Sequence, residues 1–318
     1  MSSPRRSNKK FSALIVGLGN IGFGYDEDQP RYVFTHSRAY LKNKQIDLIA
    51  GIDPREARRR AFSRKTKTRA YGSIAEFNRF EKEGIDIVSI CTPTETHYRS
   101  VKECLGMKPR IIVLEKPISN DIDEARAIVK LCREKKVALY VNYMRRVDPF
   151  FAAAKKTIQQ KKLGELLFGA VYYSGGLNNN ASHFIDLLNF WLGDSFEKVN
   201  YRDNGTFGLQ YGARQFHFQT SGGFNYALTE CDLVFSRGRI RCLDSDLSYE
   251  IHESRGDRYF KNYRALKKTE SGPIPSLLRY QVRVVEHILD YLKRGTKLRS
   301  TGDTALKTLE IIEKVKRA

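Results

Sequence analysis

The chain has 318 residues, which at roughly 100–200 residues per domain predicts about two domains. Hydrophobic residues make up 41% and aromatic residues 11%, enough for a packed core, so an intrinsically disordered chain is excluded. No apolar run approaches the roughly 18 residues that cross a bilayer. The formal net charge of +20 predicts an anionic partner, which could be nucleic acid, an anionic membrane or a small phosphorylated ligand.

The cysteines are five in number, scattered, and without a CxxC pair. This usage argues against a disulfide scaffold or a structural zinc site and favours a reducing, cytoplasmic compartment. Residues 1–10 are polar and basic and are expected to form a loose tail. Arg5 and Arg6 precede an apolar stretch, as in an export signal, but Gly17 and the glycines after it break that stretch, so a first strand is the better interpretation.

Short runs of isoleucine and valine alternate with helical segments over the first half of the chain. This alternation is typical of a parallel, doubly wound sheet, the α/β class. The predicted strands are residues 11–16, 46–52, 85–91, 110–114 and 137–141, and the predicted helices are residues 55–66, 95–106 and 121–135, the last capped by Ser119 or Asn120.

The pattern changes near Asn142, where alternating and β-rich segments joined by glycine and aspartate turns predict a largely antiparallel sheet, the α+β class. The predicted strands are residues 166–173, 215–219, 224–235, 239–243 and 247–252, and the predicted helices are residues 149–160, 182–192, 277–294 and 304–316. Residues 266–276 are polar with two prolines and are expected to form a loop. We therefore expect a first domain over residues 11–143 and a second over 144–318, whose C-terminal helices are candidates to pack back on the first.

A glycine-rich segment, GLGNIG, follows the first predicted strand directly, with glycines at Gly17, Gly19 and Gly22. In this context the three glycines would serve the tight turn, the approach of backbone to a pyrophosphate, and close packing of helix on strand. The segment therefore predicts a dinucleotide site, although a glycine-rich turn that binds nothing is the alternative. Asp53 ends the second strand and favours NAD, because a carboxylate there accepts hydrogen bonds from the adenosine ribose; a helix cap is its other interpretation.

The choice between NAD and NADP stays open, because Arg55, Arg58 and Arg59 follow Asp53 and could bind a 2′-phosphate instead.

The spacing between the glycine loop and Asp53 indicates an insertion, because Gly22 and Asp53 are 31 positions apart, where about 20 are usual. The extra residues fall in Phe23–Thr35. This insertion is either a lid carrying Tyr25, Arg31 or Tyr32, or a surface loop.

Three further segments carry a family resemblance. They are ICTPTETH ending at His97, the tripeptide Glu115-Lys116-Pro117 after a strand, and Gly175-Gly176 followed by His183, Asp186 and WLG. In register with the glycine loop, they resemble the glucose–fructose oxidoreductase / inositol dehydrogenase (Gfo/Idh/MocA) family over residue 11 to the C-terminus. The resemblance implies an N-terminal Rossmann domain, a C-terminal domain with an open, mainly antiparallel sheet, and NAD(P)-dependent hydride transfer at a sugar or polyol carbon.

The resemblance also implies a set of site residues, with Lys116 beside the nicotinamide in a Lys-Pro peptide that is often cis. His183 has the ordinary pKa of a general base near neutral pH, and Lys116 can stabilise a developing alkoxide. Asn179 stands where the family usually has Asp, so it can hydrogen-bond substrate but cannot ionise. The expected catalytic residues are Lys116 and His183, and no metal is expected. The expected substrate contacts are Asn179, Asp186, Arg146 and Tyr25, although Asp186 could instead orient the imidazole. The expected cofactor contacts are Gly17, Gly19, Asn20, Ile21, Gly22, Asp53, Thr92, Pro93, His97, Glu115 and Lys116.

The leading functional hypothesis is a cytoplasmic, homo-oligomeric (dimeric or tetrameric) NAD-dependent sugar dehydrogenase. Its net charge suits a nucleotide-linked sugar, for example oxidation of a UDP-N-acetylhexosamine at C3 in surface polysaccharide synthesis. The alternative is a cofactor-sensing regulator of the same fold without turnover. A third hypothesis, nucleic-acid binding through the basic residues 55–69, lacks a recognised nucleic-acid fold, so a solvated helix face is the better interpretation and neither nucleic acid nor membrane is expected as partner.

Overall fold

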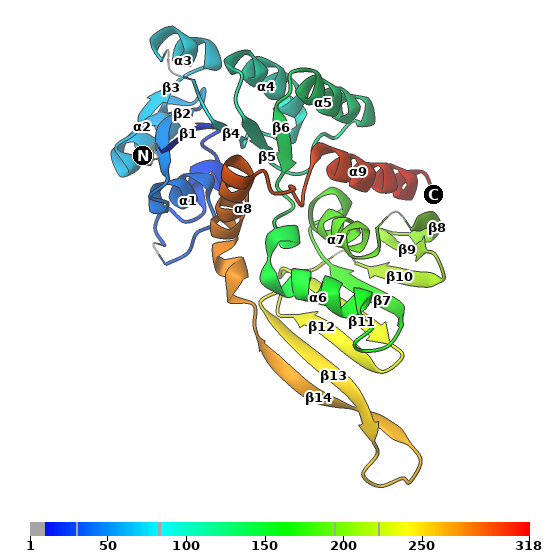
Figure 1. Ribbon diagram of the computed structural model, residues 1–318. Coiled ribbons are helices and arrows are strands. Elements are labelled where there is room, and N and C mark those ends of the chain that lie inside the picture. Colours follow the sequence, from blue (N-terminus) through cyan, green and yellow to red (C-terminus); the bar gives the residue numbers. More distant parts are fainter. Residues whose placement is uncertain (1–9, 30, 82–83, 194, 222) are drawn as a thin grey trace, which may run out of the picture. The chain divides into compact units, whose positions relative to one another are not determined.

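Figure 1 shows a computed structural model of the chain, which describes residues 10–29, 31–81, 84–193, 195–221 and 223–318. Nine of the ten residues expected to form a basic tail lie outside this range. The chain divides into two units: Met1–Asn142 with Arg279–Gly302, and Tyr143–Leu278 with Asp303–Ala318. We call them the first and second units.

The first unit contains a six-stranded sheet in the order β3-β2-β1-β4-β5-β6, with every neighbouring pair parallel. The predicted doubly wound sheet is confirmed. Its central strands are buried along their whole length, which is why they are continuous runs of branched apolar residues. The strands are β1 (Phe11–Val16), β2 (Ile46–Ile52), β3 (Arg69–Tyr71), β4 (Ile87–Ile90), β5 (Ile111–Leu114) and β6 (Ala138–Val141).

Helices α1 to α5 connect these strands, and α8 joins the unit from the C-terminal part of the chain. The sequence missed two of these helices, α1 and α3. The unit also holds short helical turns, η1 (Asn20–Gly24) at the glycine loop, η2 (Thr94–Thr96) and η3 (Leu105–Met107). The helices are α1 (His36–Lys42), α2 (Glu56–Thr66), α3 (Ile74–Phe80), α4 (His97–Cys104), α5 (Ile122–Glu134) and α8 (Tyr280–Arg294).

The N-cap of α5 differs from the prediction. Asp121, not Ser119 or Asn120, is the cap, because its carboxylate accepts the backbone N–H groups of Asp123 (2.8 Å) and Glu124 (2.9 Å). The hydroxyl of Ser119 instead accepts the backbone N–H of Asp121 at 3.1 Å. Ser119 therefore orders the turn before the helix and leaves the capping to the aspartate.

The two C-terminal helices belong to different units. Helix α8 is part of the first unit, where the ring of His287 lies 6.1 Å from that of Tyr140 and Leu292 accepts a hydrogen bond from Arg110. Helix α9 (Gly302–Arg317) is part of the second unit. The chain thus returns to the first unit before it ends in the second.

The second unit is built on an eight-stranded sheet in the order β14-β13-β12-β11-β7-β10-β9-β8. Only the pair β7–β10 is parallel, so the predicted mainly antiparallel sheet is confirmed. The strands are β7 (Leu166–Tyr173), β8 (Phe196–Asp203), β9 (Thr206–Tyr211), β10 (Arg214–Gln219), β11 (Thr229–Phe235), β12 (Gly238–Leu243), β13 (Ser248–Gly256) and β14 (Arg264–Pro273).

One face of this sheet is buried, as the alternating burial of β10 and β12 shows. Helices α6 (Pro149–Gln159) and α7 (Ser182–Leu192) pack on it: Phe150 of α6 lies 4.7 Å, ring to ring, from Tyr249 of β13, and Asn189 of α7 accepts a hydrogen bond from Tyr211 of β9. The indole N–H of Trp191 donates to Phe151 and joins the two helices. The turns η4 (Met144–Val147), η5 (Leu177–Ala181) and η6 (Pro275–Arg279) complete the unit's elements; α8 begins directly after η6.

The loop predicted over residues 266–276 is wrong for most of its length. Residues 264–273 form β14, which pairs only with β13 at the edge of the sheet. Most of its residues are exposed. An edge strand of this kind buries no apolar face, so its sequence lacks the alternation by which strands are predicted. Strands β8 and β9 were also missed, and β11 begins five residues later than predicted.

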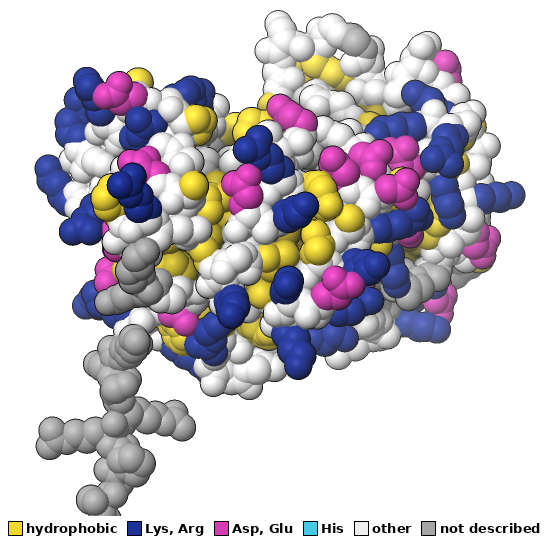
Figure 2. All heavy atoms as spheres, turned by 90° about the horizontal axis from the view of Figure 1, so that it is seen from above, with side chains coloured by type: hydrophobic (Ala, Val, Ile, Leu, Met, Phe, Trp, Pro, Cys, Tyr) yellow, Lys and Arg dark blue, Asp and Glu magenta, His cyan; other side chains and the backbone are white. Residues whose placement is uncertain are grey.

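Other classes of site can be judged for the described part of the chain. None of its helices is long and apolar enough to cross a membrane, and no three His, Cys, Asp or Glu side chains within it are grouped to hold a metal ion. All five cysteines are free and buried. Figure 2 shows lysine and arginine side chains spread over the face that it draws, with acidic side chains among them.

A buried ion pair yields a stability prediction for the second unit. Arg145 pairs with Asp246, and both side chains are almost fully buried. Burial raises the pKa of the Asp246 carboxyl, although Arg145 opposes this. Removing the guanidinium in Arg145→Leu leaves a buried carboxylate without its counter-charge, which costs about 3–5 kcal/mol of unfolding free energy at neutral pH. In the folded protein the raised pKa lets Asp246 take up a proton at a higher pH than in the unfolded chain. As the pH falls, Asp246 becomes neutral and no longer needs a counter-charge, so the loss of unfolding free energy in Arg145→Leu should shrink.

The fluorescence of Trp191, the single tryptophan, reports urea unfolding of this unit at neutral and acidic pH. Arg255→Leu is the matched control, because Arg255 and its partner Glu253 are 60% and 44% exposed, so its loss should cost no more than about 1 kcal/mol. Equal losses in the two variants, or a loss for Arg145→Leu that does not vary with pH, would contradict the prediction.

Candidate functional site

The glycine loop leaves β1 and turns under steric constraint at two of its three glycines. Gly17 has φ +97°, and a Cβ there would lie 2.6 Å from the backbone of Cys91. A Cβ on Gly22 would lie 2.1 Å from the carbonyl oxygen of Gly17, so only glycine lets η1 pack against the turn. Gly19, by contrast, has open space where a Cβ would stand. The loop is therefore tightly packed against the protein at Gly17 and Gly22 and has free space beside Gly19, where a ligand could approach the loop's backbone.

A cleft of about 840 Å³ lies in the first unit along this loop. Its walls come from the carboxyl ends of β1, β2 and β4 and the segments that follow, the position at which doubly wound sheets bind ligands. Predicted site residues that line it are Gly17, Gly19, Asn20, Ile21, Asp53, Thr92, Pro93 and, although expected to contact substrate, Tyr25. Arg55 and Arg58 line it as well, whereas Gly22, His97, Glu115 and Lys116 are not in its wall.

Asp53 joins two parts of this cleft. One carboxylate oxygen accepts the backbone N–H of Leu18 in the glycine loop at 3.0 Å, and the other accepts the backbone N–H of Arg55 before α2 at 2.9 Å. Arg55, not Asp53, occupies the N-cap position of α2. The carboxylate is thus fixed at the edge of the cleft, with lone pairs left for further donors such as ribose hydroxyls.

The insertion at residues 23–35 closes on Asp26, a buried residue. Its carboxylate accepts hydrogen bonds from the backbone N–H groups of Phe34 (2.7 Å) and Thr35 (3.0 Å) and pairs with Arg38. Tyr32 stacks on Phe34 at 5.1 Å. Tyr25 is 59% exposed and reaches the wall of the cleft. Both the lid and the surface-loop hypotheses remain predictions.

A buried hydrogen-bonded chain ends on Glu115, the residue before Lys116. His36 Nε2 lies 2.8 Å from Glu115 Oε1, and the amide nitrogen of Asn142 donates to the same oxygen at 2.7 Å. On its other side, His36 Nδ1 lies 2.9 Å from Ser89 Oγ, which is 2.6 Å from the hydroxyl of Tyr40. We call these five residues the Glu115 chain.

Every link of the Glu115 chain is satisfied when His36 carries a proton on Nε2 and donates it to Glu115. Nδ1 then either accepts from Ser89 or donates to it, and the Ser89 hydroxyl accepts from Tyr40 or donates to it accordingly. Burial raises the pKa of Tyr40, so its hydroxyl stays protonated at the far end of the chain. Burial also raises the pKa of Glu115, but the hydrogen bonds from His36 and Asn142 and the charge of Lys116 hold it below its usual value. The chain therefore places a stable negative charge next to Lys116.

His97 and the peptide bond after Lys116 belong to the same region. The Lys116–Pro117 bond is cis, as the resemblance predicts. The imidazole of His97 is buried between carbonyl oxygens, with Nδ1 3.0 Å from Pro117 O and Nε2 3.1 Å from Thr92 O. Burial lowers its pKa despite these contacts. His97 thus links the segment after β4 to the turn after Lys116, and a direct contact with cofactor stays a prediction.

His183 lies in the second unit, in the first turn of α7, and is largely buried. The ring of Tyr143 meets it edge to face at 5.7 Å and 87°. Burial raises the pKa of Tyr143, and the charge of Asp186 raises it further. Tyr143 therefore stays neutral, and its ring packs against the imidazole.

Asp186 and Arg146, both expected to contact substrate, contact one another. Arg146 Nε donates to one carboxylate oxygen at 2.7 Å, and a second guanidinium nitrogen donates to the other at 2.9 Å. The hydroxyl of Thr308 on α9 adds a hydrogen bond at 3.2 Å. Burial raises the pKa of Asp186, while Arg146 opposes the rise. This pair ties η4, α7 and α9 together, and its role toward substrate stays a prediction.

Asn179 lies in the short turn η5, which follows two glycines with positive φ. Gly175 has φ +75°, and a Cβ there would lie 2.8 Å from the amide nitrogen of Asn180. That amide in turn donates to the carbonyl of Ser174 at 2.8 Å. The glycine pair therefore allows the asparagine turn to fold tightly just before His183.

Sequence reasoning missed several residues of these clusters, among them His36, Tyr40, Ser89 and Tyr143. His36 and Tyr40 are one turn apart in α1, and a histidine four residues before a tyrosine on a short helix is the only local signal that they share a face. Their partner Glu115 is 79 positions away in the sequence. Contacts at that separation leave no mark in a single sequence.

Comparison with known proteins gives a family match for the first unit. Residues 11–143, which contain the six-stranded sheet and its glycine loop, match the GFO_IDH_MocA family model, described as an oxidoreductase family with an NAD-binding Rossmann fold. The match covers less than half of the chain, and it agrees with the Rossmann fold of the first unit.

Relatives and a solved structure give the range of similarity. An inositol 2-dehydrogenase of Rhizobium meliloti (strain 1021) is 29% identical over 197 residues, which cover 57% of this chain and 56% of the relative. A UDP-N-acetylglucosamine 3-dehydrogenase of Acidithiobacillus ferrooxidans is 28% identical over 136 residues, 42% of this chain and 37% of the relative. These matches span only about a third to little more than half of the relatives' lengths.

The crystal structure of the WlbA dehydrogenase from Bordetella pertussis, in complex with NADH and UDP-GlcNAcA, has the same fold. It superimposes with a TM-score of 0.73 at 17% identity and covers 97% of this chain and 96% of that chain. At this identity the likeness extends to the fold and no further.

The Glu115 chain gives a prediction about coupling. His36 and Asn142 donate to the same oxygen, so His36→Ala and Asn142→Ala should not be additive in unfolding free energy; a coupling of about 0.5–3 kcal/mol is expected. Urea unfolding followed by far-ultraviolet circular dichroism measures the two single variants and the double variant. As control, His36→Ala is combined with Asp121→Ala, whose carboxylate caps α5 and should add independently. An additive His36/Asn142 pair would show that the two donors do not share a carboxylate.

Proposed function

We propose that this chain is an NAD-dependent oxidoreductase that transfers hydride between the nicotinamide and a secondary alcohol of a sugar. The observation that carries the proposal is the glycine loop, closed by Gly17 and Gly22 and open at Gly19, in a cleft edged by the fixed carboxylate of Asp53. The family match over the same residues supports it.

The residues present fit an NAD cofactor. Gly19 leaves room for a pyrophosphate beside the loop, and Asp53 keeps lone pairs for the ribose. Bound NAD supplies the hydride acceptor.

The proton chemistry falls to Lys116 and His183 in this proposal. Oxidation of an alcohol removes the hydroxyl proton as hydride leaves carbon, and the imidazole of His183 is the proposed base. The ammonium of Lys116 stabilises negative charge on the substrate oxygen, and the carboxylate of Glu115 keeps a compensating charge beside it. Tyr143 positions the imidazole by its ring contact.

A nucleotide-linked sugar is the substrate class that we propose. Two of the proteins compared above carry such sugars in their names, a UDP-N-acetylglucosamine 3-dehydrogenase and a structure in complex with UDP-GlcNAcA. The net charge of +20 favours capture of an anionic substrate. Oxidation of a UDP-N-acetylhexosamine at C3 is the specific reaction proposed, with Asn179 hydrogen-bonding a sugar hydroxyl or the N-acetyl group.

We also propose that the protein works in the cytoplasm as a homo-oligomer. Free, buried cysteines suit a reducing compartment. On β7, Phe168 and Tyr172 point to the same face of the sheet and are each more than 40% exposed. Large aromatic side chains on an open sheet face are typical of a surface that a second copy covers.

The cofactor proposal predicts tighter binding of NADH than of NADPH. The carboxylate of Asp53 should repel a 2′-phosphate, so Asp53→Asn, which keeps an acceptor oxygen for the Leu18 N–H, should narrow the preference by raising NADPH affinity. Arg58→Gln is the counterpart: it should weaken NADPH alone, because the arginine lines the same end of the cleft. Fluorescence titration measures all three proteins. Tighter NADPH binding by the unmodified protein would reverse the assignment.

The catalytic proposal predicts that Lys116→Ala and His183→Ala each lower turnover by about 10²-fold or more while NADH still binds. Steady-state rates on the sugar that reduces NAD, with NADH titration in parallel, separate chemistry from cofactor binding. Normal turnover in either variant would remove that residue from the mechanism.

A third prediction concerns Asn179. If its amide contacts substrate equally in the ground and transition states, Asn179→Ala should chiefly raise KM and leave kcat unchanged. Asn179→Asp adds a carboxylate that would favour the protonated imidazole, so the pH–rate profile should move toward higher pH. The measurement is kcat and KM across pH for both variants. If both variants match the parent at every pH, Asn179 has a structural role and no contact with substrate.

A further inference from the structure

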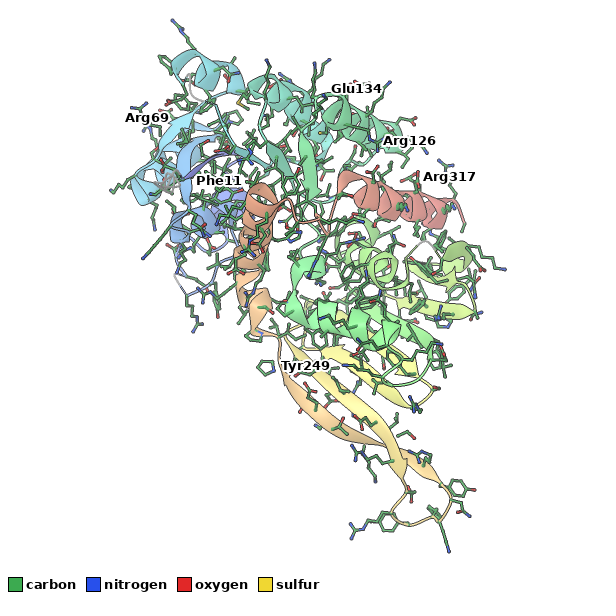
Figure 3. The ribbon with its side chains drawn as sticks, in the orientation of Figure 1. Phe11, Arg69, Arg126, Glu134, Tyr249 and Arg317 are labelled. Carbon is green, nitrogen blue, oxygen red and sulfur yellow. The ribbon has the colours of Figure 1, made fainter. Side chains whose placement is uncertain are left out.

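The hairpin of β13 and β14 ends in a loop whose composition nothing in the proposed reaction uses. In Figure 1 the paired strands extend beyond the other strands of their sheet, and in Figure 3 Tyr249 marks the end of the hairpin nearest that sheet. We call residues 254–265, at the opposite end, the hairpin tip; they read SRGDRYFKNYRA.

Three aromatic rings stand in solvent at the hairpin tip. Tyr259 is 79% exposed, Phe260 66% and Tyr263 70%. The rings of Phe260 and Tyr263 meet edge to face at 5.9 Å, so they form one small apolar cluster. Single exposed aromatic residues are common, but three within five residues at the end of a projecting hairpin form a patch of the kind that marks an interaction surface.

The charge around this cluster is positive. The tip holds four basic side chains, at Arg255, Arg258, Lys261 and Arg264, all on exposed residues, against the single acid Asp257. Arg255 reaches back to Glu253 and Arg264 to Ser254, which leaves Arg258 and Lys261 nearest the aromatic rings in the sequence. Farther along the hairpin, acidic Glu250 pairs with Lys268, so the excess of positive charge is confined to the tip.

Asp257 is occupied by the turn itself. One of its carboxylate oxygens accepts the backbone N–H groups of Tyr259 (2.8 Å) and Phe260 (2.9 Å), and its own N–H donates to the carbonyl of Tyr263 at 2.9 Å. These N–H groups lower its pKa. The one acid therefore orders the loop that presents the rings, and its charge is held against the backbone.

Rings with polar edges and flanking cations match the interface of an anionic lipid bilayer. Tyrosine and phenylalanine settle at the level of the headgroups, and arginine and lysine bind the lipid phosphates. A nucleic-acid strand needs a groove or a flat platform to stack on, whereas a hairpin end is convex. A second copy of this chain, at a net charge of +20, attracts a cationic tip less than an anionic bilayer does.

We propose that the hairpin tip docks on anionic membrane surfaces, with Tyr259, Phe260 and Tyr263 in the headgroup layer and Arg258 and Lys261 on lipid phosphates. This replaces the expectation from the sequence that no membrane is a partner. The contact is peripheral, and it is independent of the proposed reaction because no residue of the tip belongs to the cofactor cleft or to the clusters around Glu115 and His183.

The test is sedimentation of the full chain with vesicles of phosphatidylglycerol and phosphatidylcholine, compared with phosphatidylcholine alone. The unmodified protein should bind the anionic vesicles, and bind them less as salt rises. Two variants remove the rings (Tyr259→Ser, Phe260→Ser, Tyr263→Ser) or the charges (Arg258→Gln, Lys261→Gln). Each should lower the partition coefficient by about tenfold or more.

Matched controls change the same kinds of side chain elsewhere. Tyr226→Ser removes a ring that is 60% exposed, and Arg294→Gln with Lys297→Gln removes two exposed cations from the first unit. Both controls should bind vesicles as the parent does, and NADH affinity and circular dichroism should be unchanged in every variant.

Several outcomes would overturn the proposal. These are a parent protein that ignores anionic vesicles, tip variants that bind as well as the parent, and controls that lose binding equally, which would indicate diffuse charge. Tip variants that lose affinity for single-stranded RNA but not for vesicles would assign the surface to nucleic acid. Tip variants that keep vesicle binding but change the oligomeric state in sedimentation velocity would assign it to a second copy.

Discussion

The carboxylate of Asp53 is the interaction on which the cofactor cleft depends. It stands at the end of β2, yet it accepts hydrogen bonds from the glycine loop at Leu18 and from Arg55 at the start of α2. A buried carboxylate between two backbone N–H groups fixes the spacing of three segments with one residue. The sterically closed contact of Gly22 with Gly17 fixes the loop from the other side. The open face at Gly19 is what remains, and it is where a ligand can enter.

A second buried carboxylate organises the region around Lys116. Glu115 would be costly in its ionised form without donors, and the fold supplies them from α1 through His36 and from the end of β6 through Asn142. Helix α1 begins directly after the insertion, and it still supplies His36 and Tyr40 to the Glu115 chain. Asp186 follows the same principle in the second unit, where Arg146 and Thr308 hold it. In each case the polar residues next to proposed catalytic groups are fixed by partners from other elements.

The sequence predicted those parts of the fold that local pattern determines. Strands β1, β2 and β7 and helix α7 have the predicted bounds, because each is a run of apolar residues ended by a glycine, a polar residue or a turn. Strand β14 could not be found in this way, since its exposed residues carry no alternation and its existence depends on pairing with β13. The N-cap of α5 was misplaced by one or two residues, because adjacent Ser119, Asn120 and Asp121 are all good caps and only geometry chooses among them. In the candidate site, the glycine loop could be predicted from the sequence. The partners of Glu115 could not, because they come from segments far apart in the chain.

The central claim is that this fold turns over a sugar substrate and does more than bind NAD. The most direct test is NADH formation by the unmodified protein with NAD and a panel of free and nucleotide-linked sugars, followed by absorbance. The account predicts that NADH forms with at least one nucleotide-linked sugar and much more slowly with free inositols and hexoses. Tight NAD binding with no NADH formed from any member of the panel would contradict it and would favour a cofactor-sensing regulator of the same fold.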